Sequence, residues 1–312
     1  MQKTIKRGLG LLCICIIAKP VFAQYYFRDD KHYSNDLVIE AGLSVGVMNS
    51  FTDLGGRSGQ GKGFLKDLTM KTTRPSAGFY AAAIYREWLA VRLEATFGTV
   101  HGYDSILQNV AASTQGRYER NLSFKSPVRD VQLAFELHPL FLKYYEENKA
   151  PFWSPYLVAG IGLFNFNPQA QLNGQWYDLQ PLRTEGQGFA EYPGKKQYKR
   201  TQLNIPLGIG LRYEIKTNLF IRAELVHRVL FTDYLDDVSG TYIDPAAFYN
   251  HLPAAQAAIA EQLANRSIML ENGYRPGPGE QRGNPKDNDS YFTFQLKLGY
   301  TIPGQKRKGT SR

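Results

Sequence analysis

The chain has 312 residues, a hydrophobic fraction of 43% and a mean hydropathy of −0.36, which together exclude a helical membrane protein. Its formal charge of +9 is scattered along the sequence rather than gathered into one stripe, which argues against nucleic-acid binding. The 20 tyrosines, 18 phenylalanines and 29 glycines suit a β-barrel with aromatic strand ends.

Residues 1–23 have the pattern of a secretory signal peptide, and residues 24–312 are then expected to form a single domain. Basic residues precede an apolar run over 9–18, which is too short for a membrane anchor, and a small-residue cleavage site ends at Ala23. Both cysteines, Cys13 and Cys15, lie in this segment. The mature chain would therefore contain neither a disulfide nor a cysteine-bound metal.

Alternation of apolar with polar or small residues recurs eight times after the signal. A period of two predicts β-strands with one apolar face, and about ten residues is the length that a tilted strand needs to cross a bilayer. The predicted strands lie at residues 37–48, 75–85, 88–99, 131–138, 156–164, 202–214, 219–229 and 291–302.

The segments between these strands alternate in length. Long loops at about 50–74, 100–120, 165–199 and 232–289 alternate with turns at 86–87 and 216–218 and with a moderate return over 139–154. This asymmetry is typical of outer-membrane barrels and not of soluble sandwiches or lipocalins. We therefore predict an all-β fold, an eight-stranded antiparallel up-and-down transmembrane barrel with four long external loops. Short helices are expected in the last loop, with Asp244 as N-cap, Pro245 as first residue and a second helix over 254–264.

The non-apolar face of the predicted strands carries many charges. An eight-stranded barrel is only wide enough to be filled by its own side chains, so inward charges should pair with one another. The short turn at 216–218 would place Arg212 opposite Glu224 and Glu214 opposite Arg222. The inward set is Glu40, Arg92, Glu94, Glu136, Arg212, Glu214, Arg222, Glu224, Arg228 and Lys297. Aromatic residues at the strand ends suggest interfacial girdles, at Tyr85, Trp88, Trp153, Tyr156, Tyr213 and Phe231.

Three motifs in the loops could carry chemistry, and none predicts a site. Residues 56–63 approach a P-loop but end in Gly63, where a magnesium-binding hydroxyl is needed. His101, Asp104, Ser105 and His251 contain the residue types of a hydrolase triad, although sequence cannot show that they converge. The acids at 236–237 and 287–289 could bind a cation, but the second group lacks the glycine and distal glutamate of a calcium loop, which favours solvated loop acids or helix caps. We therefore expect no catalytic residue, no cofactor and no metal site.

Four loop stretches resemble one Bacteroidetes family of outer-membrane barrels, which includes the type IX secretion component PorG. They are residues 53–56, 61–67, 233–242 and 281–289, and the resemblance extends over the mature chain. It implies an outer-membrane barrel that couples the membrane to the periplasmic ring of that secretion system. The resemblance implies no catalytic residues.

These observations predict a non-enzymatic anchor or scaffold in the outer membrane with membrane lipid as a partner, and the resemblance implies the periplasmic ring proteins of the type IX secretion system as further partners. Two alternatives remain: a surface adhesin or ligand-binding barrel with no role in secretion, and a loop-borne lipid hydrolase. The aromatic-rich return over 139–154 is the periplasmic segment best suited to dock a partner. Its candidate docking residues are Phe141, Tyr144, Tyr145, Phe152 and Trp153.

Overall fold

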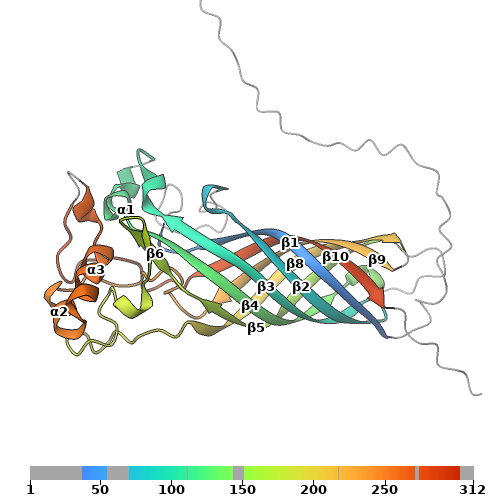
Figure 1. Cartoon of the computed structure of the whole chain (residues 1–312). Coiled ribbons are helices and arrows are strands. Elements are labelled where there is room, and N and C mark those ends of the chain that lie inside the picture. The colour runs from blue at the N-terminus through green and yellow to red at the C-terminus, as the bar shows by residue number, and fades with distance from the viewer. Residues whose placement is uncertain are drawn as a thin grey trace, which may run out of the picture.

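A computed structural model of the chain describes residues 37–54, 70–110, 112–142, 151–216, 218–270 and 274–302. These residues form an elongated β-barrel that carries a folded cap at one end (Figure 1). The predicted signal peptide and the P-loop-like stretch lie outside the described residues.

Eight strands form the barrel wall. Each pairs antiparallel with its neighbours along the chain, and β10 pairs with β1 to close the sheet. The predicted fold class is therefore confirmed. The strands are β1 (Leu37–Phe51), β2 (Arg74–Tyr85), β3 (Leu89–Tyr103), β4 (Ser123–Leu137), β5 (Trp153–Phe166), β8 (Thr201–Lys216), β9 (Leu219–Leu230) and β10 (Ser290–Ile302).

The described parts of the long loops meet at one end of the barrel and fold into the cap (Figure 1). They contain the hairpin β6 (Gln169–Leu172) and β7 (Gln175–Asp178), which continues the sheet beyond β4, and the helices α1 (Gln115–Arg120), α2 (Ala246–His251) and α3 (Ala254–Ala264). The helix pair of the last loop is confirmed, and the Ala246 amide donates to Asp244 Oδ1 at 3.0 Å. The hairpin was not predicted, although its Asn173-Gly174 turn, with φ of 50° and 83°, is a sequence signal for one.

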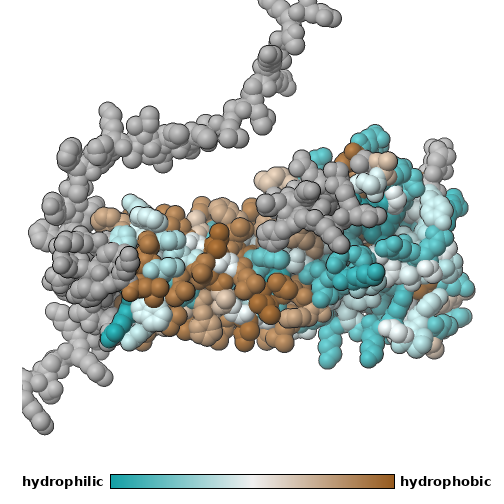
Figure 2. Space-filling model, turned by 180° about the vertical axis from the view of Figure 1, so that it is seen from behind, coloured by the Kyte–Doolittle hydropathy of each residue, from teal (hydrophilic) through white to brown (hydrophobic). Residues whose placement is uncertain are grey.

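The outer face of the barrel is apolar. Alternate residues along each strand point outward, and Leu43, Leu93 and Leu203 are 69%, 56% and 57% exposed. Figure 2 shows this hydrophobic surface over the barrel and a hydrophilic surface over the cap. Water-soluble monomers rarely expose an apolar surface of this extent, so the outer face fits a bilayer. Among the described residues, no helix is long and apolar enough to cross a membrane.

Two strands are longer at the cap end than their apolar alternation predicts. β3 continues to Tyr103 and β4 begins at Ser123, where the prediction had a loop. The outward residues of these extensions are polar or basic, such as His101, Lys125 and Arg129, so the pattern used to find the strands disappears there.

The assignment of Tyr156 to the interfacial girdle was wrong. Its side chain is 1% exposed and lies inside the barrel, whereas Trp153 and Tyr213 are each 52% exposed and Phe231 is 58% exposed. Tyr156 precedes the outward-facing Leu157 on β5, and neighbouring strand residues point to opposite faces. Position at a strand end therefore does not decide which face a tyrosine occupies.

We expect Leu207→Arg to destabilise the barrel. Leu207 is 47% exposed in the middle of β8, and an arginine facing lipid at mid-depth costs about 2–4 kcal/mol. Urea unfolding in lipid vesicles, followed by the gel mobility of unheated protein, measures the change. The exposed Lys196→Arg in the cap is the control, and an unfolding free energy for Leu207→Arg equal to that of this control would contradict the membrane assignment.

Candidate functional site

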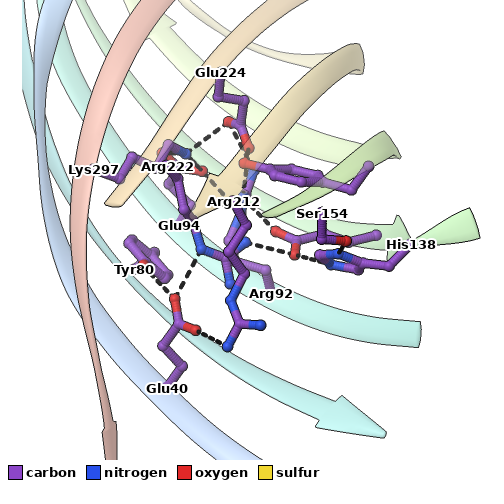
Figure 3. Close-up of polar contacts among 12 residues, drawn as sticks. Glu40, Tyr80, Arg92, Glu94, His138, Ser154, Arg212, Arg222, Glu224 and Lys297 are labelled. Carbon is purple, nitrogen blue, oxygen red and sulfur yellow. Dashed lines mark hydrogen bonds and ion pairs between the residues drawn. The ribbon is translucent and has the colours of Figure 1, made fainter. Parts of the chain in front are cut away.

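The barrel interior contains a network of buried ion pairs centred on Arg92 of β3. Its guanidinium donates to Glu224 at 2.6 and 2.9 Å and to Glu136, and it lies 3.1 Å from Glu94. These side chains are between 0% and 2% exposed. One arginine therefore connects the carboxylates of β3, β4 and β9 across the interior (Figure 3).

Two further cations extend this network to β1 and β10. Arg222 donates to Glu40 and to Glu136, both at 2.8 Å. Lys297 of β10 contacts Glu94 at 2.6 Å and Glu224 at 2.7 Å.

Arg212 completes the network at its edge. It lies 3.3 Å from Glu40 and 2.9 Å from Glu87 in the β2–β3 turn. Four cations thus meet four strand carboxylates, and the charges within that set cancel. The set is Arg92, Arg212, Arg222 and Lys297 with Glu40, Glu94, Glu136 and Glu224.

Two tyrosines fill the interior beside the ion pairs. Tyr80 donates to Glu40 at 2.6 Å, and Tyr156 donates to Glu224 at 2.8 Å. Their rings occupy the space that glycines leave free: a Cβ on Gly210 would lie 2.1 Å from the Tyr156 ring, and one on Gly299 would lie 2.3 Å from the Tyr80 hydroxyl. The inward glycines therefore make room for the two aromatic rings.

The paired interior network is confirmed, but two of its predicted pairs are wrong. Arg212 is opposite Arg222 rather than Glu224, and Glu214 is opposite Phe220 rather than Arg222. The observed register of β8 against β9 differs from the predicted pairing by two residues, and a bulge between Glu214 and Lys216 interrupts it near the turn. A shift of two keeps every side chain on its face, so the inward assignment survived the error in register.

A second group of buried side chains fills the barrel interior at the cap end. Arg228 pairs with Asp130 at 2.5 Å and donates to Thr293 at 2.9 Å. Beyond it, a buried apolar cluster that includes Phe164, Phe166 and Tyr291 joins the barrel mouth to the cap. Ion pairs and aromatic rings therefore fill the interior at successive levels.

The cap has a hydrophobic core of its own. Residues from the β6–β7 hairpin, the segment 179–189 and the helices α2 and α3 pack together, with Phe189, Phe248 and Leu263 each 1% exposed. Buried ion pairs tie the loops to one another, Arg120 to Asp104 at 2.8 Å and Arg282 to Glu185 at 3.0 Å. The described parts of the long loops are thus a packed structure.

An acidic cluster lies under the cap, outside the membrane-spanning strands. Burial raises the pKa of Asp233 to about 9 and, with the charge of Asp53, that of Asp236 to about 8. Burial also raises the pKa of Asp237 to about 6 and that of Asp289 well above its usual range. Within the described part of the chain, no group of three or more His, Cys, Asp or Glu side chains is arranged to hold a metal ion.

The residues considered for a hydrolase are held by other partners. Asp104 is paired with Arg120, and His251 stacks on Phe189 with its Nε2 atom 2.5 Å from Glu191. His101 lies on β3, opposite Lys125 of β4. Of the acids at 236–237 and 287–289, Asp287 is exposed, and the other three belong to the buried acidic cluster.

The described members of the predicted docking set, Phe141, Phe152 and Trp153, lie at the end opposite the cap. Phe152 and Trp153 are 58% and 52% exposed, and Phe141 is half-buried in a short 3-10 helix, Pro139–Leu142. The Glu214 amide donates to the Phe152 carbonyl at 2.8 Å, which fixes the end of the return beside β8. Tyr144 and Tyr145 lie outside the described residues.

Comparison with solved structures finds outer-membrane barrels. Yersinia pestis Ail, in complex with a heparin analogue, is 11% identical with a TM-score of 0.35 and covers 85% of this chain and 99% of its own. Neisserial surface protein A is 8% identical with a TM-score of 0.36, covering 86% and 98%. Escherichia coli outer membrane protein W is 13% identical with a TM-score of 0.31, covering 87% and 100%. No family model and no curated protein matches the sequence.

The closed eight-stranded sheet, its apolar outer face and its charged interior define an integral outer-membrane β-barrel. This class includes adhesins as well as other small outer-membrane proteins, so the fold does not select one activity.

We expect Glu136→Gln to destabilise the barrel by about 3–5 kcal/mol, because it leaves the four buried cations of the network with only three strand carboxylates. Urea unfolding in lipid vesicles measures the loss. Glu191→Gln removes an ion pair that is largely exposed and should change the free energy of unfolding by less than about 1 kcal/mol. Equal effects of the two substitutions would contradict a structural role for the interior network.

The acidic cluster predicts that the cap loses stability as the pH rises. A free aspartate has a pKa of about 3.9. Because the pKa of Asp233 in the folded protein is about 9, the folded state retains a proton that the unfolded state has released, and stability falls between about pH 4 and 9. Hydrogen exchange of the cap, corrected for its intrinsic pH dependence, should show less protection at pH 9 than at pH 5.

Asp233→Asn should reduce this loss, whereas the exposed Asp287→Asn should leave it unchanged. Protection that stays constant or increases from pH 5 to pH 9 in the unmodified protein would refute the prediction.

Proposed function

We propose that this chain is a non-enzymatic anchor in the outer membrane that docks a periplasmic partner through its β4–β5 return. The observation that carries the proposal is the exposed apolar surface at the end opposite the cap. Leu142, Phe152 and Trp153 are 60%, 58% and 52% exposed there. Trp153 is opposite Tyr213 on β8, which is also 52% exposed.

The filled interior favours a role as an anchor rather than as a transport channel. Ion pairs among side chains from all parts of the barrel wall occupy the space that a solute would need. A folded protein cannot pass through an eight-stranded barrel of this kind. A role in secretion would therefore depend on holding other components at the membrane.

The identity of the partner is suggested by the resemblance of the loops to the PorG-containing family. On that basis we propose the periplasmic ring proteins of the type IX secretion system as the partner. The interfacial girdle is a competing role for Trp153 and Tyr213, because aromatic residues favour the membrane–water interface on their own account.

Site-specific photo-crosslinking in the native cell envelope tests the docking surface. A photo-crosslinker at Phe152 should capture a periplasmic ring protein, and one at Tyr249, which is 50% exposed in the cap, should not. Deletion of the gene should retain secreted cargo inside the cell. Normal secretion in a deletion strain without a second copy of the gene would refute the secretion role.

The folded cap favours a second candidate function, a surface adhesin or ligand-binding barrel. A packed core over the segment 179–189, α2 and α3 is more structure than is needed to close the barrel mouth. Normal secretion combined with loss of a surface-binding phenotype in the deletion strain would support this alternative.

A further inference from the structure

The lipid-facing surface of the barrel ends abruptly on β4, β5 and β8. One row of outward residues, Val131, Leu163 and Leu203, is apolar, with exposed fractions of 50%, 55% and 57%. The next row toward the cap is Arg129, Asn165 and Thr201. Arg129 is exposed and is opposite Phe97 on β3. A cation therefore directly adjoins the apolar band that faces the membrane.

Further basic side chains continue this boundary toward the cap. Lys125 lies four residues from Arg129 on the same face of β4, and its Nζ is 3.7 Å from the centre of the Trp176 ring. Together with Arg200, the residues Lys125 and Arg129 of β4 form what we call the cationic edge.

The cationic edge can bind an external anion, because its existing ion pairing is weak. Arg200 lies 3.7 Å from Asp178, but both side chains are about 40% exposed, and an exposed pair at this distance is weak. Arg200 also donates to Asn167 at 3.0 Å, which fixes its guanidinium beside β5.

The opposite side of the barrel differs in chemistry. Among the described strand residues, the outward positions of β1, β10 and β9 at this level are Asn49, Phe292 and His227, followed by Phe51, Ser290 and Val229. Phe51 and Phe292 pack with ring centres 5.4 Å apart. No lysine or arginine occupies these positions, so the only cation in the two compared sets of described strand positions is Arg129 on β4.

A solvated surface patch would explain basic residues anywhere on the cap, but not their position. The cationic edge begins one row from lipid-facing side chains, and the aromatic rings of Phe97 and Trp176 lie beside it, as is typical of a membrane interface. Arginine binds phosphate oxygens through paired N–H groups, and basic clusters at membrane boundaries bind anionic headgroups.

We propose that the cationic edge binds the phosphate groups of an anionic lipid in the leaflet beside the long loops. The acyl chains of that lipid would lie against Val131, Leu163 and Leu203, and its phosphates would contact Arg129 and Lys125. This site is separate from the periplasmic docking surface and does not depend on the secretion role.

Native mass spectrometry of the full-length folded protein in zwitterionic detergent tests the proposal, with diphosphoryl lipid A as the probe. Lipid A without phosphates and inorganic phosphate are the comparison ligands. Lys125→Gln combined with Arg129→Gln should weaken binding of diphosphoryl lipid A by about thirtyfold, given the strength of each basic residue at a charged lipid surface. Arg129→Gln alone should produce a smaller loss.

The matched control is Arg275→Gln combined with Lys286→Gln, which removes the same charge from exposed positions on the last loop. This control should bind as the unmodified protein does, and gel mobility of unheated protein verifies that each variant is folded. Equal binding of lipid A without phosphates, or equal losses in both double variants, would overturn the proposal. Displacement of the lipid by an equal concentration of inorganic phosphate would indicate a site for soluble anions and would also overturn it.

Discussion

The structure depends on the buried ion-pair network inside the barrel. Every barrel strand contributes a side chain to it or to its hydrogen bonds, from Glu40 on β1 and Tyr80 on β2 to Lys297 on β10. Charges removed from water are costly unless each finds a partner, so the network requires all eight strands to be in register at once. The same pairing that stabilises the closed barrel also occupies its interior, and this links the fold to a function without a channel.

The two ends of the barrel have different chemistry. At the cap end, long loops pack over an apolar cluster and carry buried ion pairs such as Arg282–Glu185, so they behave as part of the folded structure. At the other end, the turns are short, and the exposed groups are the aromatic residues Phe152 and Trp153. Proteins outside the cell would meet the cap, whereas periplasmic proteins would meet the aromatic return. The proposed functions divide along this axis.

Period-two alternation was sufficient to predict all eight barrel strands, because one face of each strand is exposed to lipid and the other to a polar interior. It failed where the outward face becomes basic, at His101 and Lys125, because the outward positions there are no longer apolar. Alternation could not predict the cross-strand partners: the observed register places Arg212 opposite Arg222 rather than Glu224, and no local pattern predicts that difference. The cap core and the acidic cluster under it depend on contacts between distant loops. For the docking return, the sequence indicated its aromatic residues, and the structure adds the exposure of Phe152 and Trp153.

The central claim is that the eight-stranded barrel is closed by its own side chains. Current recordings from the purified folded protein in a planar lipid bilayer test this most directly. The ion-pair network around Arg92 and the apolar cluster at the barrel mouth predict no steady conductance above that of the protein-free bilayer. A steady, voltage-independent conductance that requires the folded protein would show an open path through the interior and would contradict the claim.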